Sequence, residues 1–228
     1  MHARVHLIHH DNRHLYTKQI EEHFRIRHDI YVGERGWTDI ARPDGREVDQ
    51  FDTEDSLYLL ALDGERVIGG SRLTPTTCPH LLADVFPHLA PRGIPRGPDI
   101  LEWTRVFVIP EFREESGYAR IGSEVMCAIL EFCLEEGISR LTGVVDAWWL
   151  PRFSDCGWAP EPLGLPREID GSPAIAVALT PSEEALRATR ELRGVDYPCL
   201  VRKGPPARHH THVFPATRSV TLPQHLDG

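Results

Sequence analysis

Apolar residues recur along the chain with two periods, one typical of strands and one typical of helices. Alternation at every second position predicts strands at 3–9, 56–62, 66–73, 99–109, 139–145 and 174–179. Near-helical spacing predicts helices at 15–32 (continuous or broken), 121–136 and 181–192, and shorter ones at 80–89 and 147–156. Apart from the short 80–89 helix, the order through residue 179 is β-α-β-β-β-α-β-α-β, which predicts one α/β domain with a mixed sheet and helices on both faces.

Short local signals refine these elements. The tripeptide Asp63-Gly64-Glu65 separates two alternating runs and predicts a β-hairpin. The strands at 99–109 and 139–145 are joined by a helix, so we expect them to be parallel neighbours in a βαβ unit. The helix at 181–192 is expected to begin after Thr180 as its N-cap.

The periodic pattern fails after Tyr197. We therefore expect a domain at 1–200 and a Pro/His-rich C-terminal tail at 201–228. The tail contains His209-His210-Thr211-His212, but no cysteine or carboxylate stands beside these histidines. A solvated tail is therefore favoured over a metal site, and no metal is expected.

Composition narrows the class of protein. The 228 residues are 41% hydrophobic, an ordinary globular share, and 25 basic against 34 acidic residues give a net charge of −9. Such an acidic chain is a poor general binder of nucleic acid or anionic membrane. The five cysteines form no CxxC pair, and the N-terminus has no apolar run like a signal peptide, so a cytoplasmic location is expected.

Several charged and aromatic residues interrupt the apolar segments. Arg27 and Tyr31 are spaced i, i+4 on the first helix, Trp37 follows a glycine-containing turn, and an acidic segment runs from Glu47 through Asp49 to Asp52. Two expected strands contain Ser71-Arg72-Leu73 and Glu102-Trp103-Thr104-Arg105. Alternation places Trp103 and Arg105 opposite Glu102 and Thr104 unless a bulge re-aims them. Arginines and carboxylates in such positions fit either a structural ion-pair network or an active site.

The order of these motifs resembles that of the acyl-homoserine lactone synthases, the LuxI-type autoinducer synthases. The matching residues are Arg27…Tyr31…Trp37, Asp49-Gln-Phe-Asp52, Arg72-Leu-Thr-Pro-Thr76, Phe86-Pro-His-Leu89 and Glu102-Trp-Thr-Arg105. The resemblance covers about 27–158. Tyr31 stands where the family usually has Phe, Trp103 where it commonly has Leu or Phe, and 146–148 lack the Thr that some members use for 3-oxo chains.

The resemblance implies a GNAT-like fold in which two parallel strands splay apart around a thioester arm. It implies synthesis of a quorum-sensing signal from S-adenosylmethionine and an acyl thioester, with release of methylthioadenosine and without a cofactor. Glu102 (as general base), Arg105 and Asp49 are the implied catalytic residues. The implied S-adenosylmethionine-binding residues are Arg27, Tyr31, Trp37, Asp49, Asp52, Arg72, Trp103 and Arg105.

The resemblance also places an acyl pocket in a segment crowded with large side chains. Its residues would be Val144, Val145, Trp148, Trp149 and Phe153. Inward-facing tryptophans would shorten a straight channel, so we expect a short, branched or aryl acyl group. The acidic chain favours coenzyme A as the carrier over acyl-carrier protein, although Arg113, Arg120 and Arg152 could form a local docking patch for the latter.

Two other functions fit the same expected fold. One is a small-amine N-acetyltransferase, but the usual pyrophosphate loop, [RQ]-x-x-G-x-[GA], is not clear, since Arg113 to Gly117 has the wrong spacing. The other is a non-catalytic module that binds an acyl ligand or a protein partner.

Overall fold

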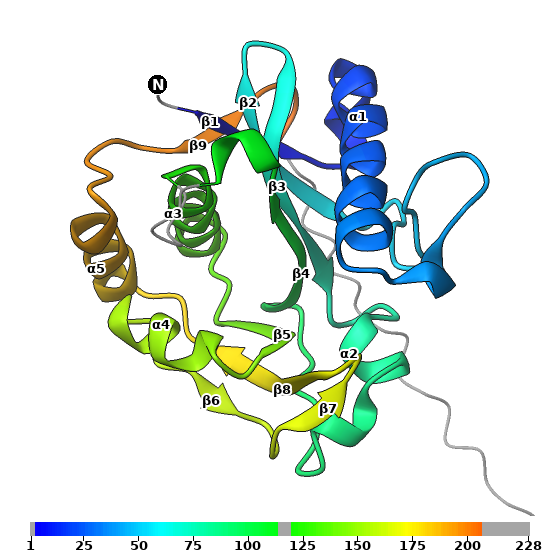
Figure 1. Cartoon of the computed structure of the whole chain (residues 1–228). Coiled ribbons are helices and arrows are strands. Elements are labelled where there is room, and N and C mark those ends of the chain that lie inside the picture. The colour runs from blue at the N-terminus through cyan, green and yellow to red at the C-terminus, as the bar shows by residue number, and fades with distance from the viewer. Residues whose placement is uncertain (1–2, 114–119, 207–228) are drawn as a thin grey trace, which may run out of the picture.

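The computed structural model describes residues 3–113 and 120–206, and a nine-stranded mixed sheet runs through them (Figure 1). The strand order is β6-β8-β5-β4-β3-β2-β1-β9, and β7 pairs with β8. The strands are β1 (Arg4–Ile8), β2 (Leu57–Asp63), β3 (Arg66–Pro75), β4 (Ile100–Val108), β5 (Arg140–Asp146), β6 (Glu161–Pro162), β7 (Arg167–Ile169), β8 (Ser172–Leu179) and β9 (Leu200–Arg202).

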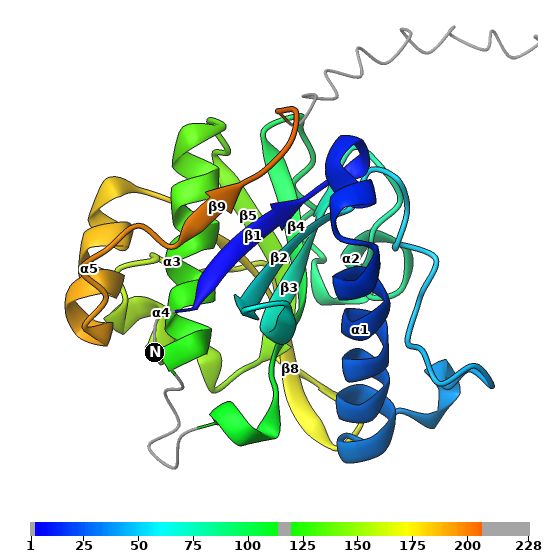
Figure 2. The ribbon, with the colours of Figure 1, turned by 90° about the horizontal axis from the view of Figure 1, so that it is seen from above.

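Helices cover both faces of the sheet, as predicted (Figures 1 and 2). One face carries α1 and α2, and the other carries α3 to α5. The α-helices are α1 (Thr17–Arg27), α2 (Leu81–Asp84), α3 (Arg120–Glu135), α4 (Trp149–Asp155) and α5 (Glu183–Arg193). A π-helix, η2 (His28–Glu34), extends α1, and 3-10 turns are η1 (His10–Leu15), η3 (Thr38–Ile40), η4 (Pro87–Leu89) and η5 (Pro110–Phe112). The helix expected at 15–32 is therefore continuous from Thr17 to Glu34 but changes from α- to π-helical after Arg27.

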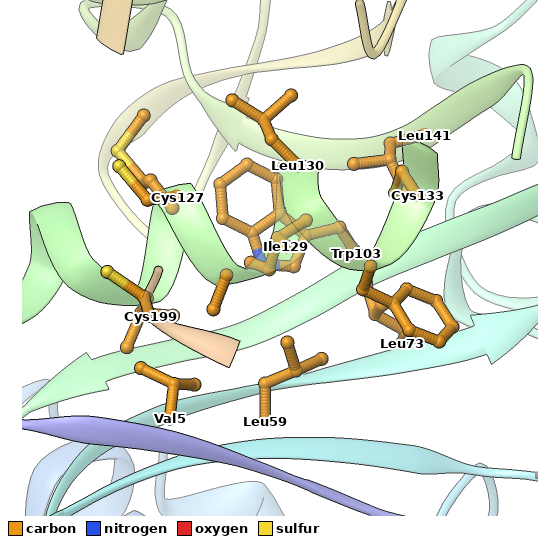
Figure 3. Close-up of a cluster of buried hydrophobic side chains, with 14 of the residues drawn as sticks. Val5, Leu59, Leu73, Trp103, Cys127, Ile129, Leu130, Cys133, Leu141 and Cys199 are labelled. Atoms are coloured by element: carbon orange, nitrogen blue, oxygen red, sulfur yellow. The ribbon is translucent and has the colours of Figure 1, made fainter. Parts of the chain in front are cut away.

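The main core lies between the sheet and α3. Figure 3 shows Ile129 and Cys133 of this helix packed with Leu73 of β3 and Trp103 of β4. Twelve residues of α3 are buried, including nearly every position from Ile121 to Cys133. Burial on this scale fixes α3 against the sheet and so fixes the strands that carry the candidate site.

β4 and β5 are parallel neighbours that separate after three residues. They pair only over Ile100–Glu102 and Arg140–Thr142, and beyond that β4 pairs with β3 alone and β5 with β8. At the point of separation a Cβ built on Gly143 would lie 2.9 Å from the Trp103 carbonyl oxygen, so only glycine lets the two backbones pass this closely. The predicted βαβ unit and its splayed strands are confirmed.

Other local predictions have mixed outcomes. The hairpin is confirmed, because Asp63 pairs with Arg66 around Gly64, which has a φ of +62°. The N-cap of α5 is Ser182 instead of Thr180, because the Ser182 hydroxyl accepts the Ala185 N–H at 3.0 Å. The short strands β6, β7 and β9 were not predicted, since two or three residues show no clear alternation.

The sheet continues past residue 200. β9 pairs in parallel with β1 and continues to Arg202, two residues beyond the expected end of the domain at 200. The rest of the expected tail from 207 onward, with its histidine run, lies outside the described residues. Among the described residues, no helix is long and apolar enough to cross a membrane.

Candidate active site

Three arginines and three carboxylates meet on the α1 side of the sheet. They are Arg27 at the end of α1, Arg72 on β3 and Arg105 on β4, with Glu47, Asp49 and Asp52 from the loop before β2. We call these six residues the ionic cluster. Tertiary folding brings them together from four separate segments of the chain.

Every guanidinium in the ionic cluster contacts two carboxylates. Arg27 donates to both oxygens of Asp52 at 2.8 Å and to Glu47 at 2.5 Å. Arg72 donates to both oxygens of Asp49 at 2.6 and 3.0 Å and lies 3.0 Å from Asp52. Arg105 donates to both oxygens of Glu47 at 3.0 Å and to Asp49 at 2.7 Å. These forked bonds fix every charged group in orientation as well as position.

The ionic cluster is neutral as a whole and nearly dry. The side chains of Arg27, Arg72 and Asp52 are 0% exposed, whereas those of Asp49 and Arg105 are 10% and 8% exposed. Burial alone would raise the pKa of Asp52, but hydrogen bonds and charge from Arg27, with the charge of Arg72, hold that pKa far below its ordinary value. Asp49 and Arg105 therefore form the most exposed edge of the ionic cluster.

A backbone bulge aims Arg105 into the ionic cluster. Strict alternation would place it on the same face as Trp103, but the β3–β4 register shifts between Gly70 and Arg72 and Arg105 has a φ of +54°. As a result Arg105 lies on the face of Thr104, whose hydroxyl accepts from Arg72 Nε at 3.1 Å. A non-glycine residue in this left-handed conformation is strained, and the salt bridges to Glu47 and Asp49 offset the cost.

An aromatic wall adjoins the exposed edge. Tyr31 and Trp37 stack with centroids 5.1 Å apart and an interplanar angle of 12°. The Arg105 guanidinium lies 5.4 Å from the Tyr31 ring centre, and Arg35 lies over both rings. The Tyr31 hydroxyl donates to the Val106 carbonyl at 2.9 Å, which fixes the ring beside the bulge. The π-helical turn that follows Arg27 carries Tyr31 to this position.

Glu102 lies outside the ionic cluster. One of its oxygens accepts the Leu81 N–H at 2.9 Å and the other accepts the Leu82 N–H at 2.6 Å, so the carboxylate caps α2. The side chain is fully buried, and this burial raises the pKa of Glu102, while the two N–H groups and His80 partly oppose the rise. A raised pKa suits a group that exchanges protons.

Trp103 lies on the opposite face of β4 from the ionic cluster. Its ring stacks on Trp158 with centroids 5.4 Å apart and lies 6.0 Å from Phe153. Phe153 in turn stacks on Trp149 at 5.6 Å. We call these four residues, Trp103, Trp149, Phe153 and Trp158, the aromatic cluster. This places Trp103 beside the expected acyl pocket and separates it from the other residues expected to bind S-adenosylmethionine.

The structure brings together only part of the expected acyl pocket. Val145, Trp149 and Phe153 pack on the α3 side of the sheet, whereas Val144 faces the small apolar cluster under α2. Trp148 is 47% exposed, with its ring stacked on Trp149 and the Arg152 guanidinium 4.3 Å from its centre. Neighbouring strand residues point to opposite faces, so Val144 and Val145 cannot both line one pocket on one side.

Two surface hollows of about 340 and 210 Å³ lie elsewhere on the described structure. The first is lined by Arg92, Arg140 and Glu161 among others, and the second by His9, Asn12 and Lys203 among others. The candidate site is defined by its charged and aromatic side chains.

Comparison with known proteins identifies this arrangement. Residues 11–189 match the family model described as autoinducer synthase. The chain belongs to the autoinducer synthase family.

Individual relatives agree with the family match. An isovaleryl-homoserine lactone synthase from Bradyrhizobium diazoefficiens is 44% identical over 89% of this chain and 90% of its own length. The structure of BjaI, a coenzyme-A-dependent acyl-homoserine lactone synthase with S-adenosylmethionine and isopentyl-CoA, superposes with a TM-score of 0.85 at 43% identity, over 91% of this chain and 96% of BjaI. The coenzyme-A-dependent synthase MesI gives a TM-score of 0.80 at 42% identity, over 87% of this chain and 99% of MesI.

This autoinducer synthase is therefore an acyltransferase that makes an acyl-homoserine lactone, and its GNAT-like fold is confirmed. The small-amine N-acetyltransferase and the non-catalytic module are not supported. Within the ionic cluster the expected motifs omitted one residue, Glu47, although it begins the acidic segment already singled out. They also omitted Trp158, since a tryptophan after a glycine gives no signal that it will stack on a residue 55 positions earlier.

Proposed function

We propose that this autoinducer synthase joins S-adenosylmethionine to a short or branched acyl group carried by coenzyme A. The proposal is supported by the three relatives above, of which one is named for isovaleryl-homoserine lactone and two are described as coenzyme-A-dependent. The observation that carries it is the position of two unlike clusters on opposite faces of β4, at the point where β4 and β5 separate.

The ionic cluster and the aromatic wall suit S-adenosylmethionine. Arg105 and Asp49 form the exposed edge, so Arg105 pairs with the substrate carboxylate and Asp49 with its ammonium. The sulfonium donates no ordinary hydrogen bond, and the faces of Tyr31 and Trp37 stabilise its positive charge. Arg27, Arg72, Asp52 and Glu47 hold these groups in place from beneath.

Two bonds form in sequence. The deprotonated amine attacks the thioester carbonyl, the C–N bond forms, and the C–S bond breaks to release the thiol of the carrier. Glu102 is the proposed base, and backbone N–H groups of the splayed strands stabilise the oxyanion. The carboxylate then attacks the γ-carbon and closes the five-membered ring as methylthioadenosine leaves. This closure is intramolecular, so a substrate held folded by Arg105 gains much of its rate from orientation.

The aromatic cluster suits a compact acyl group. Phe153 and Trp158 are 2% and 0% exposed, and Trp149 packs on Phe153, so rings occupy the space beside the splay. Forcing extra methylene groups into a packed site costs roughly 1–3 kcal/mol. A long acyl chain would therefore bind less well here than a short one. The Trp103 Nε1 atom is buried without a hydrogen-bond partner among the described residues. Its N–H can therefore donate a hydrogen bond to a carbonyl oxygen of the acyl thioester.

One reaction tests the proposal. The full chain is mixed with S-adenosylmethionine and a panel of thioesters: isovaleryl, butyryl, benzoyl and straight C8–C12 groups, each on coenzyme A and on acyl-carrier protein. Free thiol, methylthioadenosine and lactone mass are measured. We expect the highest kcat/KM with isovaleryl-CoA. A preference for long chains on acyl-carrier protein would contradict the donor proposal, and absence of all three products would contradict the reaction itself.

A further inference from the structure

A row of polar side chains crosses three strands beneath α2. Glu102 on β4 is directly opposite Thr74 on β3 and directly opposite Thr142 on β5. Residues in register on neighbouring strands point to the same face of a sheet, so the three side chains lie side by side. They are 0%, 0% and 1% exposed.

Three polar atoms around Glu102 have no partner among the described residues. They are Thr74 Oγ1, Thr142 Oγ1 and His80 Nε2, and His80 is also 0% exposed. Buried polar atoms in folded proteins are almost always hydrogen-bonded, to protein or to ordered water. Three orphans beside one buried carboxylate therefore indicate ordered water or a ligand among them.

The proton on the His80 ring can be assigned from its contact. Nδ1 lies 2.9 Å from the Cys78 carbonyl, which only accepts, so Nδ1 carries a hydrogen and Nε2 is the ring atom left to face Glu102 and its water. His80 precedes Leu81, whose N–H binds Glu102, and the ring acts electrostatically on that carboxylate. The charge of Arg72 on β3 also acts on Glu102, whereas β5 contributes the neutral Thr142.

The row borders the point where β4 and β5 separate. Glu102 and Thr142 are the last parallel pair before β4 and β5 separate. Two residues further along β4, Thr104 binds Arg72 of the ionic cluster. The row thus lies between the proposed amine site and the gap that receives the thioester.

We propose that Thr74, His80 and Thr142 hold ordered water against Glu102 as a proton relay for the acylation step. This inference rests on the proposed function. A proton passes from the substrate ammonium to a water of the row, and that water passes one of its own protons to Glu102, so no water is consumed. The nitrogen loses a second proton as the amide forms. Of the two protons removed from nitrogen, one goes through Glu102 to the departing thiolate and the other is released to solvent. Thr74, His80 and Thr142 are positioning residues in this relay, because they contact the water and not the reacting atoms.

The decisive pair of variants is Thr142→Val and Thr142→Ser. Valine keeps the shape but removes a buried hydroxyl that no protein group satisfies, so Tm is expected to stay equal or rise while kcat for thiol release falls at least tenfold. Serine restores the hydroxyl, and its kcat is expected within threefold of wild type. A structural role for Thr142 would instead move Tm and kcat down together.

His80→Phe and His80→Gln supply a second readout. His80 lowers the pKa of Glu102, so its removal is expected to move the acidic limb of the kcat–pH profile to higher pH by at least half a unit. The relay would be overturned if Thr142→Val keeps the wild-type kcat and His80→Phe keeps the wild-type acidic limb of the kcat–pH profile. If His80→Phe does not fold, the Thr142 pair decides. Wild-type thiol and methylthioadenosine release are measured first, so that failure of the reaction itself is recognised separately.

Discussion

The two clusters on opposite faces of β4 are held together by different physical forces. On one face Arg105 joins an ionic cluster in which every charge has forked, directional partners. On the other, Trp103 joins an aromatic cluster held by packing and ring stacking. A buried charge that loses its partner is costly, whereas a ring can be replaced by a smaller apolar group at the cost of volume. In the proposed function the ionic face therefore holds S-adenosylmethionine, and the aromatic face can change with the acyl group.

The largest effect is expected when the ionic cluster loses one charge. Asp52→Asn leaves the buried Arg27 without its forked partner and removes a partner of Arg72. We expect a loss of about 3–5 kcal/mol in the free energy of unfolding, and no measurable turnover. Urea unfolding followed by circular dichroism measures this loss.

The matched control for Asp52→Asn is Asp44→Asn. Asp44 forms salt bridges with Arg42 and Arg46, but these residues lie at the surface. The control is expected to leave the urea midpoint close to that of the wild type, because exposed ion pairs contribute little to stability. Equal losses of stability in both variants would show that burial of the ionic cluster does not make its salt bridges more important for folding than those at the surface.

The exposed edge of the same cluster is expected to affect catalysis more than folding. Arg105→Ala removes the proposed partner of the substrate carboxylate, and we expect kcat/KM for S-adenosylmethionine to fall by about 10³, which corresponds to roughly 4 kcal/mol. Arg35→Ala, which removes a second arginine beside Tyr31 but none of the cluster's salt bridges, is the control. A Tm loss in Arg105→Ala as large as that in Asp52→Asn would favour a purely structural network.

Acid should weaken the ionic cluster before the aromatic one. The pKa values of Asp52 and Glu47 are lowered, because their arginine bonds outweigh burial. The folded state then binds fewer protons than the unfolded state, so this stability is present above the ordinary carboxylate range, near pH 4, and is lost as pH falls below it. Urea midpoints at pH 7, 5, 4 and 3 should decrease below pH 5. A constant midpoint down to pH 3 would contradict the shifted pKa values.

The contrast between the faces also explains what the sequence could predict. Residues of the ionic cluster stand in short motifs, so the order of those motifs along the chain is enough to group Arg27, Asp49, Asp52, Arg72 and Arg105. The side to which Arg105 points could not be predicted, because it depends on a bulge with a positive φ at a non-glycine residue. The same motifs group Glu102 with this cluster, yet its carboxylate caps α2.

The aromatic cluster was harder to predict for a different reason. Its members lie on β4, on α4 and after α4, and no spacing rule links Trp103 to Trp158. Tertiary packing decides which tryptophan faces inward. Trp149 packs against the core, whereas Trp148 remains exposed. The strands and long helices were predictable because many apolar positions agree on one period. A strand as short as β9, with three residues, forms because it can pair with β1 at the edge of the sheet.

A smaller effect is expected from opening the aromatic cluster. Trp149→Leu removes a ring that packs on Phe153, so the ratio of kcat/KM for octanoyl-CoA to that for isovaleryl-CoA should rise about tenfold, or roughly 1.4 kcal/mol. Trp148→Leu is the control, since that ring is exposed and should leave the ratio unchanged. An equal change in both variants would remove Trp149 from the determinants of acyl preference.

The smallest effect is expected at the aromatic wall, where Trp37 stacks on Tyr31 in a segment that follows the π-helical turn. Because this wall adjoins Arg105, binding of S-adenosylmethionine should change the environment of Trp37 and hence the protein's tryptophan fluorescence. In Trp37→Phe most of this change should disappear, while the KM for S-adenosylmethionine rises only about threefold, since a phenyl ring still stacks on Tyr31.

Trp148→Phe should keep the full signal, because Trp148 lies with α4 on the other face of the sheet. A fluorescence change that survives in Trp37→Phe and vanishes in Trp148→Phe would move the S-adenosylmethionine site from the ionic face of β4 to the aromatic one.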